Sequence, residues 1–221
     1  MLLLPGRKVV TRSPHRRVGY ISCPWFQQSQ IQYESLLERS FVHIALLAPN
    51  VRCIESQPFR MTLEDGTTYT PDFMLHGDHQ YRLVVEVKPQ VFVSRHQVKL
   101  DAARVMLAQG GYDFLILTDE DIQSGNRHDR AAVILRHARS HAMAAFADCY
   151  AERAAALTGE HPIATLAAEW GLAEHQILGL VGRRVLAVAA GLTFDTIYPV
   201  NFQKEENHAC VLGAAWLRGS D

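Results

Sequence analysis

The spacing of apolar residues changes several times along this chain, and each change predicts a different element. Between residues 31 and 48 the apolar positions recur near the helical period, which predicts a helix that ends at Pro49-Asn50. Residues 51–63 predict a strand that Gln57-Pro58 interrupts, because proline cannot donate to a strand ladder. The Asp65-Gly66 pair that follows is typical of a hairpin turn.

The next segments continue this alternation of strand and helix. Residues 68–75 and 81–87 predict two more strands, and residues 94–109 predict a helix with Ser94 as its N-cap. Residues 112–117 form a short apolar run typical of a buried strand. The order is helix, three antiparallel strands, helix and strand. This order predicts an α/β fold with a mixed sheet that closes near residue 125.

Composition divides the chain into three predicted parts. Residues 1–30 are rich in proline, serine and glutamine and predict an extended arm, whereas residues 31–125 hold the α/β pattern. Residues 126–221 are rich in alanine and predict a small helical C-terminal domain. Within it, residues 162–190 are typical of a helix-turn-helix, and residues 193–200 predict a short strand.

Charge is unevenly distributed although its sum is only −1. Residues 1–60 carry eight Lys/Arg against three Asp/Glu, and the rest of the chain is acidic. Such a basic arm can follow a phosphate backbone, although a solvated tail is an equally good interpretation. The candidate DNA contacts in the arm are Arg7, Lys8, Arg12, Arg16 and Arg17, and Lys99 is a further candidate on the helix predicted over residues 94–109.

The remaining bulk properties favour a cytoplasmic protein with no membrane association. No apolar run approaches membrane-spanning length, and the first residues do not form a signal sequence. The four cysteines contain no C-x-x-C pair, which favours reduced thiols over a disulfide framework or a zinc site.

Two short motifs carry candidate chemistry. Asp72 follows Pro71 on one predicted strand, and Glu86-Val87-Lys88 ends the next. Residues i and i+2 of a strand share a face, so Glu86 and Lys88 point the same way. If the two strands pair, Asp72 lies next to Glu86 and Lys88. The alternatives are a surface aspartate at a turn and a simple Glu86–Lys88 ion pair.

A third carboxylate is expected from the first predicted helix, where Glu34 and Glu38 are both candidates and the local pattern does not choose between them. Carboxylate oxygens are the ligands that Mg²⁺ prefers, with Mn²⁺ as its substitute. Such an ion activates water and polarises a phosphoryl oxygen. Lys88 would orient that water or neutralise developing charge. The motifs therefore predict metal-dependent phosphodiester hydrolysis.

A longer series of motifs surrounds these residues. It comprises residues 33–38, 49–51, 57–58, 69–73 and 85–89, with further matches at residues 12–13 and 17–20. In this order and spacing, the series resembles the TnsA endonuclease subunit of heteromeric transposases. The resemblance covers roughly residues 7–120.

The resemblance implies a fold, a site and an activity. It implies a restriction-endonuclease-like core followed by a winged-helix-like domain that contacts other transposition proteins. It places Glu38, rather than Glu34, with Asp72, Glu86 and Lys88 in the catalytic site. The implied substrate is double-stranded DNA at transposon ends, where the non-transferred strand is cut. The implied partners are an integrase-like transposase subunit and an AAA-type ATPase regulator.

Two other functions remain open from the sequence. One is a stand-alone restriction or repair nuclease of the same fold. The other is a non-catalytic DNA-binding assembly adaptor that uses the basic arm and the helix-turn-helix. The residues also leave open whether the helix-turn-helix contacts DNA or protein, although its early positions Glu174, His175 and Gln176 favour a protein partner.

Overall fold

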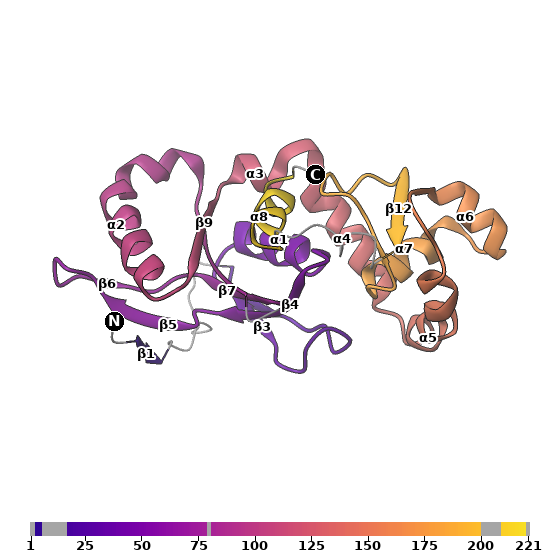
Figure 1. Ribbon diagram of the computed structural model, residues 1–221, viewed down its shortest axis with the longest axis horizontal. Helices are drawn as coiled ribbons and strands as arrows, with labels where there is room; N and C mark the ends of the chain where they lie inside the picture. Colours follow the sequence, from indigo (N-terminus) through magenta and orange to yellow (C-terminus); the bar gives the residue numbers. More distant parts are fainter. Residues whose placement is uncertain (1–2, 6–16, 79–80, 200–208, 220–221) are drawn as a thin grey trace. The chain divides into compact units, whose positions relative to one another are not determined.

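The computed structural model describes residues 3–5, 17–78, 81–199 and 209–219 (Figure 1). Contacts within the chain divide it into two compact units. The first unit comprises residues 1–42 and 51–122, and the second comprises residues 43–50 and 123–221. The segment 43–50 belongs with the second unit although it lies within the sequence of the first. No helix in the described ranges is both long and apolar enough to cross a membrane.

The first unit contains a four-stranded mixed sheet in the order β4-β7-β8-β9. Its strands are β4 (Val51–Ser56), β7 (Phe73–Gly77), β8 (Arg82–Val87) and β9 (Asp113–Leu117). The first two pairings are antiparallel and the last is parallel. The predicted mixed sheet and its order of strands are therefore confirmed. The parallel connection runs through helix α2, as a crossover between parallel strands requires.

Two predicted strands are each split in two by a break in the backbone. The break in residues 51–63 was expected at Gln57-Pro58, and Gln57 has a positive φ of 43° there. The break in residues 68–75 was not expected, and it separates β6 (Thr68–Tyr69) from β7. Asp72 consequently lies in the link before β7 rather than within a strand, so this part of the prediction is wrong.

The breaks create additional small sheets beside the main one. Strand β5 (Phe59–Thr62) pairs with β6 as the expected hairpin and on its other side with β1 (Leu3–Pro5). Strands β2 (Gly19–Ile21) and β3 (Ile31–Tyr33) form a two-stranded ribbon. Parts of the predicted N-terminal arm are thus paired strands.

Helix α1 (Leu36–Ala45) begins five residues later than the helix predicted over residues 31–48, which corrects that prediction. The reason is local hydrogen bonding. The Ser35 hydroxyl accepts from the Glu38 amide at 3.1 Å, and the Glu38 carboxylate accepts from the Glu34 amide at 2.7 Å. This arrangement resembles a capping box, which satisfies amides that the first helical turn leaves free.

Helix α2 (Gln90–Gln109) begins four residues earlier than predicted. Ser94 therefore lies inside the helix and is not its N-cap. The residue at the N-cap is Pro89, and the Gln90 amide donates to the Asp119 carboxylate at 2.7 Å. Asp119 starts helix α3 (Asp119–Gln123), so a residue distant in sequence completes the beginning of α2. Local spacing alone could not reveal this contact.

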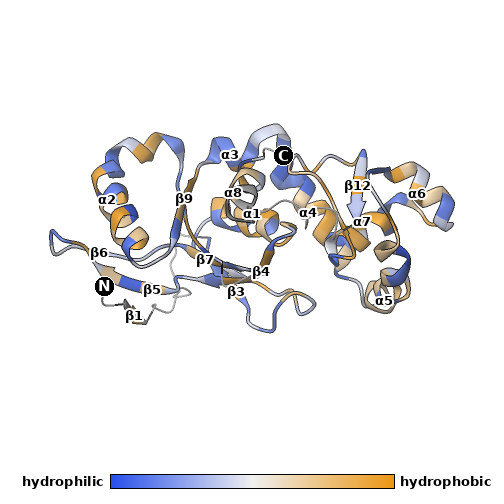
Figure 2. Ribbon diagram, viewed as in Figure 1, coloured by the Kyte–Doolittle hydropathy of each residue, from blue (hydrophilic) through white to orange (hydrophobic). Residues whose placement is uncertain are grey.

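The face of the sheet beneath α2 carries an apolar cluster. Val84 and Met74 from the sheet pack there with Ala103 and Leu107 from α2, together with residues of β5 and β6. On α1, Phe41 contacts Phe73 with ring centroids 5.1 Å apart. Figure 2 shows hydrophobic segments alternating with hydrophilic ones along α1 and α2. This packing fixes the orientation of β8 and therefore of the residues at its end.

The second unit is mainly helical. Its helices are α4 (Arg127–Ala138), α5 (His141–Ala155), α6 (Ile163–Trp170), α7 (Glu174–Gly182) and α8 (Ala209–Arg218), with a short 3₁₀ turn at Ser124–Asn126. Its small sheet has the order β10-β12-β11, formed by β10 (His161–Pro162), β12 (Thr196–Pro199) and β11 (Leu186–Ala187). A helix-turn-helix with one strand before it and two after it has the arrangement expected for a winged helix.

The second helix of this helix-turn-helix is largely enclosed by its own unit. Every residue of α7 from Ile177 to Gly182 is buried. A β-carbon on Gly182 would lie 2.6 Å from the Ala138 β-carbon, and one on Gly179 would lie 2.4 Å from the end of the Met143 side chain. The two glycines therefore allow close packing of α7 against α4 and α5. Only the beginning of α7 is exposed.

Candidate functional site

The two motifs meet through a hydrogen bond between a side chain and the backbone. The Val87 amide donates to Oδ2 of Asp72 at 2.8 Å. Val87 is the middle residue of the Glu86-Val87-Lys88 triplet, so Asp72 lies directly beside that triplet. On the other side of Asp72, its own carbonyl accepts from the Gln57 amide at 2.8 Å. The two contacts fix the position of Asp72 although it lies outside a regular strand.

Glu86 is held by two side chains. It is only 6% exposed at the end of β8. Its Oε1 lies 3.0 Å from Nζ of Lys88, and its Oε2 accepts a hydrogen bond from the Tyr69 hydroxyl at 2.8 Å. An acid at this depth would be expensive to bury without such partners. Glu86 and Lys88 thus share one side of the strand, as the alternation of strand residues predicts.

Glu38 lies in the first turn of α1 and contributes a third negative charge. Burial raises its pKa, and the charges of Glu34 and Glu86 raise it further. Its carboxylate also caps the helix through the Glu34 amide. The structure therefore gives Glu38 a structural role, and it places the charge of Glu38 close enough to influence Asp72.

Asp72 is the carboxyl group of this site whose ionisation its surroundings oppose most. Burial raises the pKa of Asp72 well above its ordinary value, and the negative charges of Glu86 and then Glu38 add to the effect. Opposing these, the Val87 amide and the Lys88 ammonium lower it. Among the described residues, no three Asp, Glu, His or Cys side chains converge closely enough to form a ready-made metal cluster. The site thus concentrates negative charge around Asp72.

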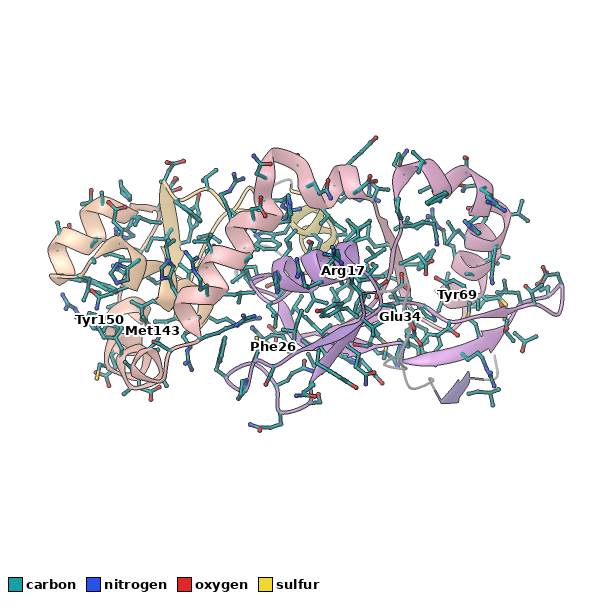
Figure 3. All side chains as sticks on the ribbon, turned by 180° about the vertical axis from the view of Figure 1, so that it is seen from behind. Arg17, Phe26, Glu34, Tyr69, Met143 and Tyr150 are labelled. Carbon is teal, nitrogen blue, oxygen red and sulfur yellow. The ribbon has the colours of Figure 1, made fainter. Side chains whose placement is uncertain are left out.

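An open pocket of about 190 Å³ lies beside Glu86. Its walls include Tyr69, Lys88 and, from α2, His96 and Lys99. The Lys99 ammonium lies 5.9 Å from the centre of the Tyr69 ring. The pocket therefore joins a buried carboxylate to several groups that can carry positive charge, which suits a phosphate. Figure 3 shows Tyr69 below α2, the helix that supplies His96 and Lys99 to the pocket.

Two pocket residues were not among the predicted site residues. Tyr69 lies three residues before Asp72, within the motif at residues 69–73, but nothing in its spacing shows that its hydroxyl reaches Glu86. Burial raises the pKa of Tyr69 well above its ordinary value, and the neighbouring Glu86 charge adds to this. Tyr69 therefore remains a proton donor at neutral pH. His96 lies in the Ser94-Arg95-His96 segment, one helical turn before Lys99, and this position near the predicted helix start was the signal for it.

The structure describes only two of the six predicted DNA-contact residues, Arg17 and Lys99. Lys99 faces the pocket, and Arg17 is exposed and labelled in Figure 3. Arg7, Lys8, Arg12 and Arg16 lie outside the described residues. Their role remains a prediction.

The basic residues after α7 are used inside the second unit. Arg183 donates to the carbonyls of Ala138 and Ser140 at 2.6 and 3.0 Å. Arg184 donates to the carbonyls of Leu46 and Pro49 at 3.3 and 2.9 Å. These arginines satisfy carbonyl groups near helix ends. Both arginines are thus engaged by backbone carbonyls of their own unit.

A mixed sheet that holds a Pro-Asp aspartate beside a Glu-x-Lys triplet defines the restriction-endonuclease-like class of nuclease cores. Residues 48–119 match the family model described as TnsA-like endonuclease N terminal. This part of the chain is therefore similar to the TnsA-like endonuclease domain, and the match supports a nuclease related to transposition. A comparison with curated proteins found no match.

Proposed function

We propose that this chain is a Mg²⁺-dependent endonuclease that cuts the non-transferred strand at transposon ends as one subunit of a heteromeric transposase. The observation that carries the proposal is the hydrogen bond from the Val87 amide to Asp72, because it joins the two motifs in one site. The family match at residues 48–119 supports the transposition context. The integrase-like transposase and the AAA-type ATPase are the proposed partners.

The residues present fit a hard divalent cation. Asp72 and Glu86 supply carboxylates whose mutual repulsion a cation would relieve, as the raised pKa of Asp72 indicates. Mg²⁺ is commonly held by one or two carboxylates, with waters and substrate phosphates completing its shell, so a three-carboxylate cluster is not required. Asp72 and Glu86 are the proposed ligands, and Glu38 would act directly or through water.

Each residue of the site has a proposed part in hydrolysis. A bound divalent ion would supply Lewis acidity toward a phosphoryl oxygen and lower the pKa of water. Lys88, 3.0 Å from Glu86, would orient the attacking water or neutralise charge on the phosphate. Lys99 and His96 line the same pocket and would hold a phosphate of the substrate.

The test is a cleavage assay on duplex DNA that carries a transposon end, labelled separately on each strand. We expect a cut in the non-transferred strand that requires Mg²⁺ or Mn²⁺ and the partner proteins, and that disappears in EDTA. Lys88→Ala should lower the cleavage rate by about 100-fold, because a positioned charge in an active site contributes a few kcal/mol.

The outcomes of this assay separate the candidate functions. Efficient cutting of unrelated DNA without partners would replace the proposal with a stand-alone nuclease. Cleavage that persists in EDTA would refute the metal-dependent mechanism. If the wild-type complex assembles on DNA but never cuts it, the non-catalytic assembly adaptor is the remaining candidate function.

Tyr69→Phe should weaken the site without removing it. The change deletes the hydroxyl that donates to Glu86 and preserves the buried ring. Groups that orient a metal ligand typically contribute 10- to 100-fold to metal affinity or activity, so we expect the Mg²⁺ concentration for half-maximal cleavage to rise about tenfold. Tyr20→Phe is the matched control because Tyr20 is 50% exposed on β2. Equal Mg²⁺ curves for both variants would exclude this role.

A further inference from the structure

Two histidine side chains meet where helices α4 and α7 of the second unit pack together. His137 lies in the last turn of α4, and His175 is the second residue of α7. Their ring centres are 5.6 Å apart, and the ring planes are inclined at 40°. His137 is half-buried and His175 is exposed, so water reaches the pair. No part of the nuclease proposal uses these two residues.

The backbone beneath the two histidines is fixed by close helix packing (Figure 1). A β-carbon on Gly179 would lie 3.4 Å from the His137 carbonyl, and one on Gly182 would lie 2.9 Å from the Ile134 carbonyl. The glycines therefore let α7 approach α4 more closely than larger residues would. Side chains on so rigid a support need little further ordering, which lowers the entropic cost of binding a ligand between them.

The distance between the rings suits two imidazoles that share one metal ion. A zinc–nitrogen bond of about 2.0 to 2.1 Å places the centre of an imidazole ring about 3.2 Å from the ion. Two such rings at a tetrahedral angle have centres about 5.2 Å apart, and an angle of about 120° brings the separation to about 5.5 Å. The observed 5.6 Å therefore requires only a small side-chain adjustment.

Ligand type selects the class of ion. Imidazole nitrogens suit Zn²⁺, Cu²⁺ and Ni²⁺, whereas Mg²⁺ prefers the oxygen ligands of the carboxylate site. Among the residues that the structure describes, no third His, Cys, Asp or Glu completes a metal-binding group with the pair, so water would fill the remaining positions as at an open zinc site. Glu174 precedes His175, whereas Arg136 precedes His137 and Arg183 donates to the next carbonyl of α4. These positive charges make the expected affinity modest.

We propose that His137 and His175 together bind one divalent ion of the Zn²⁺, Cu²⁺ and Ni²⁺ class and so connect the end of α4 to the start of α7. The first residues of α7 are the part of this helix that is not buried, so the ion would fix the surface that the helix-turn-helix presents. The inference is independent of the nuclease proposal, because it uses none of the residues of the nuclease site.

Urea unfolding of the full chain with and without Zn²⁺ tests the pair. Zn²⁺ at 100 times its Kd should raise the folding equilibrium constant about 100-fold more in the wild type than in His137→Gln or His175→Gln. The double variant should lose no more of the response than either single variant, because chelation requires both rings. His161→Gln is the matched control, since His161 lies on β10 of the same unit and contacts the Thr158 carbonyl. The carboxylate site is present in every variant, so its own response to Zn²⁺ cancels in the comparison.

Copper binding provides a measurement that does not depend on stability. Pulsed electron paramagnetic resonance of the wild type with one equivalent of Cu²⁺ should show two imidazole nitrogens on the ion, and a spectrum without them would refute the proposal even where a variant fails to fold. Equal Zn²⁺ responses in the wild type and both variants would mean that the rings only pack together, and would overturn the proposal. A response lost in one variant and kept in the other would overturn it as well, because the ion would then have a different set of ligands. Circular dichroism in EDTA checks the fold of each variant, and Mg²⁺-dependent cleavage reports separately on the nuclease site.

Discussion

Asp72→Asn should lower cleavage by about a thousandfold, the equivalent of about 4 kcal/mol of transition-state stabilisation, while leaving the fold intact. Asparagine has nearly the shape of aspartate, and its carbonyl can still accept from the Val87 amide. It cannot, however, supply an anionic ligand beside Glu86. The rate of nicking in saturating Mg²⁺ measures the effect. The exposed Asp148 on α5 provides the matched control as Asp148→Asn.

The same substitution should stabilise the metal-free protein at neutral pH. Burial and the charges of Glu86 and Glu38 raise the pKa of Asp72 above its ordinary value of 3.8, so the folded chain retains a proton that the unfolded chain releases. The ionised Asp72 therefore lowers the stability of the wild type above the folded-state pKa. That loss diminishes as the pH falls from the folded-state pKa toward 3.8. Asp72→Asn removes this contribution to the pH dependence of stability.

Divalent cations should make the wild type more stable than Asp72→Asn, which reverses the order expected for the metal-free proteins. Ligand at 100 times its Kd stabilises a folded protein by about 2.7 kcal/mol, so Mg²⁺ should raise the unfolding midpoint of the wild type and leave Asp72→Asn nearly unchanged. Denaturant unfolding across pH, with and without Mg²⁺, measures both effects. Normal nicking by Asp72→Asn, or an equal response of both proteins to Mg²⁺, would show that Asp72 is not a metal ligand.

Arg127→Met should have the largest effect on stability. Arg127 is 1% exposed at the start of α4, and its guanidinium donates to the carbonyls of Leu217 at 2.6 Å and Trp216 at 2.8 Å. It also lies 5.7 Å from the Trp216 ring. These carbonyls belong to the last turn of α8, where a cation is favourable. The arginine thus joins the first and last main helices of the second unit.

The expected loss follows from these contacts. Two charge-assisted hydrogen bonds contribute about 1.5 to 3 kcal/mol each, so Arg127→Met should lower the unfolding free energy by about 3 to 6 kcal/mol. Arg127→Lys should recover only part of it, because an ammonium lacks the fork that reaches two carbonyls. Arg136→Met, at an exposed position of the same helix, should change stability by less than about 0.5 kcal/mol.

Urea unfolding of the full chain measures these differences. Because the chain forms two compact units, fluorescence and circular dichroism should be followed together to detect separate transitions. A midpoint for Arg127→Met equal to that of Arg136→Met would contradict the proposed role of Arg127.

Much of the first unit follows from local pattern. The order of strands, the interruption at Gln57-Pro58 and the common side of Glu86 and Lys88 depend on properties of short segments. Alternation determines which side a strand residue takes, and proline determines where a ladder fails. The helical character of residues 127–157 and the short strand near Thr196–Pro199 are likewise local.

Contacts between segments distant in sequence decided the element boundaries and the buried surfaces that the local pattern left open or predicted wrongly. Pairing of β2 with β3 makes residues 31–33 a strand, and Asp119 completes the start of α2 before Ser94. In the second unit, packing against α4 and α5 buries α7, so its sequence alone does not reveal which surface remains for a partner.

The sequence by itself determined that an aspartate after proline precedes a Glu-x-Lys triplet on the next strand, and hence which chemistry is available. Only the tertiary structure decided that Asp72 leaves the strand to meet the Val87 amide, and that Tyr69 holds Glu86. The physical reason is that side-chain type and strand alternation are local properties. Burial, hydrogen-bond partners and the repulsion that raises the pKa of Asp72 depend on which distant segments pack together.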